Sequence, residues 1–288
     1  MDTFSEKHIN NNKNKAELCK FLIDSISYSF NCYKENFNVC KKEFSEESVH
    51  DYRVSIRRLL SLINLINKIF PEIDSNRIKK VLKKQLKIMN PLRDNQVQIL
   101  KIRNMAESYP ILYLYYNNLV KQEEELIKSI VFIISKIDFI ELEGNCIFLK
   151  NEIRKALLSK YSDFQSLISL ATDLYYQVIE LIKVANRSDL QTIHKVRLQF
   201  KKYRYTIETI QPIIDLKKPY LKKMKHFQTI LGKIQDNKVL VTNLEEFTKT
   251  CPNIPQSAFL PTMEKILKER EELLDDFFNS KLINSFWK

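Results

Sequence analysis

The chain has 288 residues, of which 44% are apolar and only two are glycine. Rossmann and P-loop turns need two or three closely spaced glycines, and sheet proteins use glycine at turns and bulges, so this composition predicts a mostly helical protein. The formal net charge of +12 favours an anionic partner, such as nucleic acid, a phosphate polymer or an acidic membrane face.

The first predicted helix covers residues 14–40 and follows a polar tail that lacks the apolar stretch of a signal peptide. No window approaches the roughly 18 apolar residues that a membrane span needs. The five cysteines are scattered and form no C-x-x-C pair, which favours reduced thiols over a disulfide framework or a zinc ribbon. We therefore expect a soluble, cytoplasmic chain with no membrane insertion.

A second helix is expected to start at Ser48 and to contain the segment VHDYRVSIRRLLSLINLI, residues 49–66. A third helix is expected to end at Asn90-Pro91, a fourth to contain Asp94-Asn95, and a fifth to cover residues 111–138. In the second helix the apolar residues recur at the spacing of one helical face: Val49, Tyr52, Ile56, Leu59, Ile63 and Ile66.

The segment IHKVRLQFKKYRYTIETI, residues 193–210, repeats the second helix 144 positions later. A further match follows downstream at an offset of 142. Two matched segments in the same order predict an internal duplication, with one half at residues 1–143 and the other at 144–288. The matched pairs are His50/His194, Arg53/Arg197, Arg57/Lys201, Arg58/Lys202, Asp94/Asp236 and Asn95/Asn237.

The second half is expected to open with a helix at residues 161–187 and to repeat the second helix from Asp189. Its third helix is expected to end at Gly232 as a C-cap, and its last helix to cover about 259–279. We expect an all-α fold of two pseudo-symmetric antiparallel helical bundles. The repeated helix again has one apolar face: Ile193, Val196, Phe200, Tyr203, Ile207 and Ile210.

Positive charge is concentrated in the duplicated elements. Residues 49–103 contain 13 Lys/Arg against 4 Asp/Glu, and residues 193–233 contain 11 against 2. On the repeated helices the cations form stripes beside the apolar face, comprising His50, Arg53, Arg57 and Arg58, and then His194, Arg197, Lys201 and Arg204. The third helices add Arg77, Lys80, Lys84 and Lys87 in one half, and Lys218, Lys222 and Lys225 in the other.

Stripes of this kind can be solvated helix faces, but their duplication and their lack of acidic residues favour an anion site. Like charges at i, i+4 destabilise a helix by about 0.2–0.5 kcal/mol, and a bound anion would offset that repulsion. Arginine offers a planar fork of donors that suits phosphate oxygens, and lysine offers a mobile point charge. A nearby polyanion would also favour the protonated, two-donor form of histidine.

Three other interpretations fit parts of the pattern less well. His50-Asp51 is the dipeptide of HD phosphohydrolases, but the only upstream histidine is His8, and Lys195 replaces the aspartate in the second copy. A zinc site is disfavoured because the sequence contains no His-x-x-x-His pair. RNA or DNA binding by the same charges is the main alternative, although few aromatic residues such as Tyr205 are available for base stacking.

The segments VHDYRVSIRR and IHKVRLQFKKYRYTIE resemble the two signature helices of the CHAD family, an all-helical family named for its histidines. The segments at Arg93-Asp94 and Gln235-Asp236 are also similar to the family pattern, and the resemblance covers about residues 14–280. It implies two four-helix-type bundles with a basic groove or channel between them that binds inorganic polyphosphate. No cofactor and no metal are implied.

Leu60 stands where the family often repeats an arginine, which implies weaker binding by the first half. Gln235 stands where the first half has Arg93, which removes one further cation. The segment Glu141-Leu142-Glu143-Gly144-Asn145 lacks the lysine of the E-x-E-x-K motif found in fused CYTH domains, which predicts a non-enzymatic module without catalytic residues. Storage, association with polyphosphate granules and regulation of a partner are all open as its purpose. By position, the implied polyphosphate-binding set is His50, Arg53, Arg57, Arg58, Arg77, Lys80, Lys84, Lys87, Arg93, His194, Arg197, Lys201, Lys202, Arg204, Lys218, Lys222 and Lys225.

Overall fold

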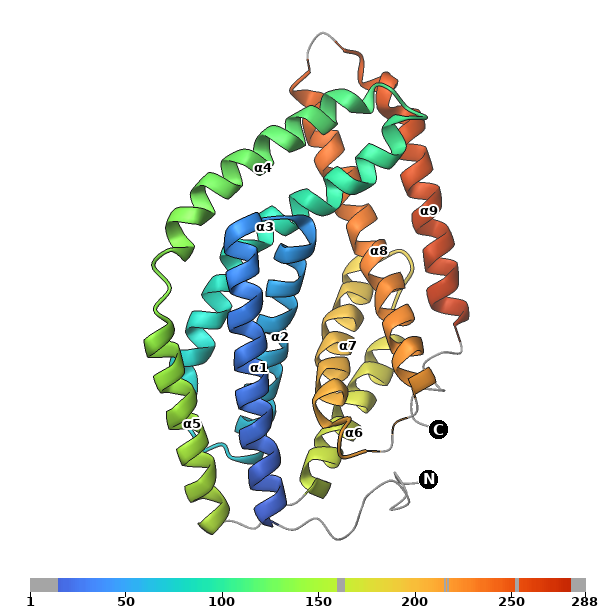
Figure 1. Cartoon of the computed structure of the whole chain (residues 1–288). Helices are drawn as coiled ribbons and strands as arrows, with labels where there is room; N and C mark the ends of the chain where they lie inside the picture. Colours follow the sequence, from blue (N-terminus) through green and yellow to red (C-terminus); the bar gives the residue numbers. More distant parts are fainter. Residues whose placement is uncertain (1–14, 160–163, 215, 217, 252–253, 281–288) are drawn as a thin grey trace. The chain divides into compact units, whose positions relative to one another are not determined.

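A computed structural model describes residues 15–159, 164–214, 216, 218–251 and 254–280. Over these residues the fold is all-α, as predicted, and contains no strand (Figure 1). The helices are α1 (Lys15–Glu43), α2 (Glu46–Ile69), α3 (Asn76–Ala106), α4 (Leu112–Ile134), α5 (Phe139–Ser159), α6 (Phe164–Lys183), α7 (Leu190–Ile210), α8 (Lys218–Lys249), the short 3₁₀ helix η2 (Gln256–Phe259) and α9 (Leu260–Asn279).

The apolar periodicity of the two repeated helices is confirmed, because every residue of both predicted faces is buried in α2 or α7. The starts of these helices follow from their caps. Asp189 precedes α7 as predicted, and its Oδ1 accepts a hydrogen bond from the backbone N–H of Gln191 at 2.9 Å. The predicted start at Ser48 is wrong, because the Oγ of Ser45 accepts the backbone N–H of Ser48 at 3.2 Å and α2 begins at Glu46.

The predicted helix ends at Asn90-Pro91 and Gly232 are wrong, because α3 continues through the proline and α8 through the glycine. A proline inside a helix costs about 3 kcal/mol, but Met89 and Leu92 on either side of it are fully buried, and their packing offsets that cost. Gly232 stays helical between the buried residues Leu231 and Ile234. The predicted third and fourth helices of each half are therefore single helices.

The fifth predicted helix, 111–138, corresponds to α4, which ends at Ile134. A further helix, α5, follows at Phe139–Ser159 and was not predicted. Asp138 precedes it, and the Asp138 Oδ1 accepts hydrogen bonds from the backbone N–H groups of Ile140 at 2.8 Å and Glu141 at 3.1 Å. Gly144, the predicted junction of the halves, lies inside α5.

The described residues fall into two compact units. Unit 1 comprises those within 1–90, 130–180 and 199–217, and unit 2 comprises those within 91–129, 181–198 and 218–288. Four of the five boundaries fall within helices, and the fifth coincides with the start of α8. They differ from the boundary between the predicted halves. The duplication, with its halves 1–143 and 144–288, is a relation between sequence segments and stays a prediction.

In unit 1, α1 packs lengthwise against α2 and α5 (Figure 1). The ring of Phe37 on α1 lies 4.7 Å from that of Phe139 on α5. The hydroxyls of Tyr33 and Tyr52 both donate to the Oε1 of Gln85 on α3, at 2.8 and 2.9 Å. Burial raises the pKa of Tyr33 to about 12, so its hydroxyl remains a donor over the physiological range. This buried triad joins α1, α2 and α3.

In unit 2, α8 packs against α9, and an apolar core joins them to the C-terminal part of α3 and to α4. Lys101 on α3 donates to the Oδ1 of Asn237 on α8 and to the Oε2 of Glu269 on α9. This lysine is thus engaged within the unit, where it links three helices.

Candidate anion-binding surfaces

The cations of α2 differ in their surroundings. Arg53 is only 6% exposed, and its Nη1 donates to the Oδ1 of Asn90 on α3. It therefore holds two helices of unit 1 together at a position where the sequence predicts an anion ligand. His50 and Arg58 are exposed, and Arg57 is half-buried.

A second set of cations lies on one face of α3 in unit 1, and we call it the α3 basic face. It consists of Arg77, Lys80, Lys84 and Lys87, whose 3-4-3 spacing places them on one side of the helix over about 15 Å. All four are exposed, and none forms an ion pair with another described residue. Residues 75–93 contain no Asp or Glu, so no carboxylate on this stretch of chain compensates the charge.

The two repeated helices meet in unit 1 at the carboxylate of Glu208, near the end of α7. The Oε2 of Glu208 lies 3.3 Å from the Nε of Arg58 on α2. Its Oε1 lies 2.7 Å from the Nε and 2.5 Å from the Nη2 of Arg204, four residues earlier on α7. The side chain of Arg58 is 56% exposed, whereas those of Arg204 and Glu208 are 16% and 18% exposed.

This arrangement brings one cation from each repeat to a single anionic group. The sequence placed both arginines in the binding set but gave Glu208 no role. The only sequence signal was its i, i+4 spacing from Arg204. Beside Arg204 on α7, Lys201 is half-buried and Lys202 is exposed.

In unit 2, His194 is half-buried near the start of α7 and its Nδ1 lies 2.9 Å from the Oε1 of Gln235 on α8. Gln235 is the residue that replaces the arginine of the first half. If the histidine Nδ1 carries the proton, this amide oxygen accepts it and fixes the ring orientation, leaving the Nε2 for another partner. The substitution thus removes a cation and supplies a hydrogen-bond partner for His194.

The seventeen predicted binding residues are divided between the two units, and a single groove shared by all of them stays a prediction. Unit 1 contains His50, Arg53, Arg57, Arg58, Arg77, Lys80, Lys84, Lys87, Lys201, Lys202 and Arg204. Unit 2 contains Arg93 and Arg197, both half-buried, together with His194 and the exposed Lys218, Lys222 and Lys225.

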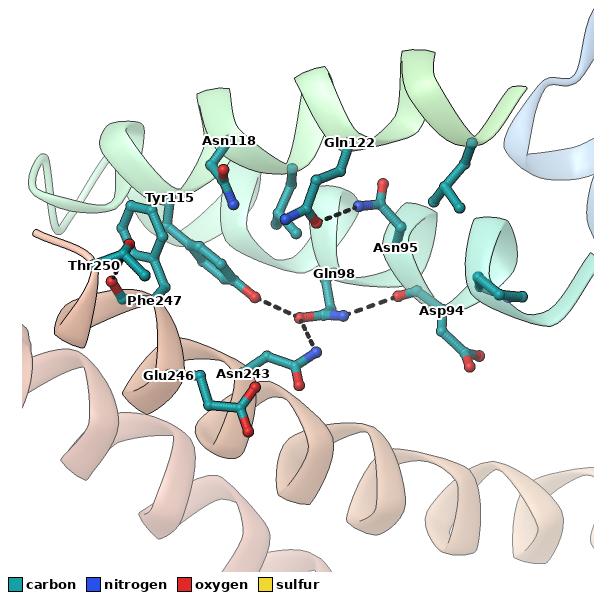
Figure 2. A pocket seen from close by; sticks show the side chains of 13 residues that line it. Asp94, Asn95, Gln98, Tyr115, Asn118, Gln122, Asn243, Glu246, Phe247 and Thr250 are labelled. Carbon is teal, nitrogen blue, oxygen red and sulfur yellow. Dashed lines mark hydrogen bonds between the residues drawn. The ribbon is translucent and has the colours of Figure 1, made fainter. Parts of the chain in front are cut away.

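A cavity of about 520 Å³ lies in unit 2 between α3, α4 and α8 (Figure 2). None of the predicted binding cations lines it, and sequence reasoning did not find it. Its lining residues are Pro91, Asp94, Asn95, Gln98, Tyr115, Asn118, Leu119, Gln122, Leu126, Asn243, Glu246, Phe247 and Thr250.

The alternatives raised by the sequence find little in the described residues to support them. His8, which an HD-type metal site would need, lies outside those residues, and within them no three His, Cys, Asp or Glu side chains are grouped to hold a metal ion. Tyr205, the aromatic residue considered for base stacking, is buried. Across the same part of the chain, no helix combines the length and apolarity needed to cross a membrane.

The fold and the basic helix faces define an all-α protein with clustered surface cations. The CHAD domain family model matches residues 34–129 and 145–245, and the chain belongs to that family. No curated protein matches the chain.

Two solved structures have the same fold. The crystal structure of the CHAD domain from the plant Ricinus communis is 16% identical, with a TM-score of 0.67 over 93% of this chain and 90% of that one. PptA from Streptomyces chartreusis is 13% identical, with a TM-score of 0.62 over 90% of this chain and 97% of that one.

Proposed function

We propose that this chain is a non-enzymatic binder of inorganic polyphosphate, which it holds through the basic helix faces of both repeats. The observation on which this rests is the meeting of Arg58 and Arg204 at Glu208. Both arginines contact one anionic group within unit 1, which supports the proposal that cations of both helices can bind a shared anion. The exposed α3 basic face of the same unit offers further charge to a longer polyanion.

Polyphosphate suits these surfaces better than nucleic acid does. A phosphate polymer presents only anionic oxygens, which match arginine forks and lysine point charges. A reader of single-stranded RNA or DNA would also need exposed aromatic platforms for the bases, and α3 contains no aromatic residue, while Tyr205 on α7 is buried. Tyr28 on α1 is 73% exposed and interacts electrostatically with Arg58, so it is the side chain on which a base could stack. We propose that this binding takes place in the cytoplasm. Association with polyphosphate granules is one form that storage could take.

The affinity for polyphosphate is expected to fall steeply with salt. If about eight phosphates are contacted, counterion release from a single-stranded polyanion gives a slope of log K against log salt of roughly −6. Titrating labelled polyphosphate at several salt concentrations measures this slope, and a flat response contradicts the electrostatic account. Single-stranded RNA and inorganic phosphate serve as competitors, and stronger competition by the RNA would favour the nucleic-acid alternative.

Replacing Glu208 with Gln is expected to raise polyphosphate affinity about threefold to tenfold. The substitution keeps the shape of the side chain but removes the negative charge that competes with phosphate for Arg58 and Arg204. The matched control is Glu143→Gln on α5, which changes the net charge equally at an exposed carboxylate elsewhere in unit 1. Equal affinities of the two variants, or weaker binding by Glu208→Gln, would show that polyphosphate does not use these arginines.

A further inference from the structure

The cavity of unit 2 has an electrostatic character opposite to that of the basic faces. Among the described residues that line it there is no Lys, Arg or His, whereas Asp94 on α3 and Glu246 on α8 both contribute carboxylates. Burial and the negative charge of Glu246 raise the pKa of Tyr115, which keeps its hydroxyl protonated. A ligand of this cavity would therefore have to be neutral or cationic.

One wall of the cavity holds a polar network whose members orient one another. The Oε1 of Gln98 accepts hydrogen bonds from the Tyr115 hydroxyl at 2.7 Å and from the Nδ2 of Asn243 at 3.1 Å (Figure 2). With its Nδ2 used as a donor, Asn243 presents its amide oxygen as a further acceptor beside the carboxylate of Glu246.

Asn95 supplies an acceptor that no described residue satisfies. This residue is only 5% exposed, and its Nδ2 donates to the Oε1 of Gln122 on α4 at 3.4 Å (Figure 2). Its Oδ1 is buried and accepts no hydrogen bond from the described residues. Leaving a buried carbonyl oxygen without a donor costs about 1–3 kcal/mol. Because this oxygen has almost no exposed surface, a ligand N–H group could reach it only after the Asn95 amide turns toward the cavity.

Apolar and aromatic groups complete the lining. The rings of Tyr115 on α4 and Phe247 on α8 lie 4.9 Å apart between their centres, and Leu119 and Leu126 of α4 extend this apolar surface. Aromatic faces attract organic cations, and aliphatic methylenes gain free energy when they are buried against leucine.

We propose that this cavity binds a small organic cation, an aliphatic amine whose ammonium groups bind Asp94 and Glu246 while its methylenes contact the apolar wall. The volume of about 520 Å³ lies within the usual range for small-molecule sites. The proposal does not depend on polyphosphate binding, because the cavity includes none of the cations proposed for that function.

The test is calorimetric titration of the full chain, free of polyphosphate, with spermidine at low ionic strength. We expect saturable binding of spermidine and no binding of glucose or inorganic phosphate. Because the protein has a net charge of +12, non-specific attraction of a polycation is disfavoured, and saturable binding therefore reports a local site. Absence of spermidine binding, or binding of glucose or phosphate with equal affinity, would overturn the proposal.

Substitutions of two adjacent carboxylates, of which only Glu246 lines the cavity, test where spermidine binds. Glu246→Gln is expected to weaken spermidine binding about tenfold or more, because a charge-assisted hydrogen bond is lost. Glu245→Gln, the neighbouring exposed residue that does not line the cavity, should leave the affinity unchanged. Asp94→Asn is expected to act in the same direction as Glu246→Gln. Equal effects at Glu245 and Glu246 would show that spermidine binds elsewhere.

Discussion

Neutralising three lysines of the α3 basic face, in the variant Lys80→Gln/Lys84→Gln/Lys87→Gln, is expected to weaken polyphosphate binding roughly fifty-fold at 0.15 M salt. Each phosphate contact on a single-stranded polyanion contributes about 0.7 to the slope of log K against log salt, so three lost contacts lower the slope by about 2. All three side chains are exposed, and none is ion-paired with a described residue, so the helix should be unaffected. Fluorescence titration at several salt concentrations measures both quantities.

The control must change the net charge by the same amount on another helix of unit 1. Lys34→Gln/Lys41→Gln/Lys42→Gln does so on α1, where all three lysines are exposed. We expect this variant to keep its affinity within a few-fold, because long-range interactions between exposed charges are screened beyond about 8 Å at this salt concentration. Equal losses in the two variants would mean that polyphosphate responds to net charge and not to the α3 basic face.

The sequence predicted those features that depend on periodicity within one helix. Six apolar positions in each repeated helix were assigned from spacing alone, and all of them are buried. The cations of the stripes, which lie next to these apolar positions in sequence, are half-buried or exposed, with the exception of Arg53. Local spacing is reliable here because the face of a long amphipathic helix is set by 3.6-residue geometry, which tertiary packing rarely overrides.

Features that depend on packing between helices were missed. Pro91 and Gly232 are helix-breaking residues in isolation, and their helices continue because buried neighbours on both sides fix the backbone. The burial of Arg53 depends on Asn90, which lies 37 residues away on α3. The pairing of Arg58 with Glu208 spans 150 residues, and no one-dimensional pattern identifies such a partner.

The cavity shows the same limit for site prediction. Its polar lining comes from α3, α4 and α8, and each contributes amides at positions that look like ordinary helix surface in sequence. The repeat did identify the Asp94-Asn95 pair, but only as a match to Asp236-Asn237. That Asn95 faces a cavity, while Asn237 accepts a hydrogen bond from Lys101, could not be predicted from two identical dipeptides.

Replacing Gln85 with Leu is expected to lower the free energy of unfolding by about 3 kcal/mol. Gln85 is buried on α3 next to Lys84 of the basic face, and its Oε1 accepts both tyrosine hydroxyls of the triad. Leucine would remove the acceptor that the two hydroxyls share, and each hydroxyl left buried without an acceptor costs about 1–3 kcal/mol. The two hydroxyls also interact with each other, so one of them can still donate to the other. Part of this cost is offset, because the Nε2 of Gln85 itself has no hydrogen-bond partner among the described residues. Urea denaturation monitored by circular dichroism measures the loss.

Removing the tyrosine hydroxyls as well should reverse the effect. In Gln85→Leu/Tyr33→Phe/Tyr52→Phe every polar atom of the triad is gone, and an apolar contact of similar size is expected to be as stable as the original network. The double variant Tyr33→Phe/Tyr52→Phe completes the cycle and isolates the coupling between the amide and the hydroxyls. If the triple variant is as unstable as Gln85→Leu, the loss arises from packing instead. Gln85 lies on the buried side of α3, whereas the lysines of the α3 basic face are exposed, so the triple variant should also retain its polyphosphate affinity. That result would distinguish the effect of the triad on stability from the effect of the lysines on binding.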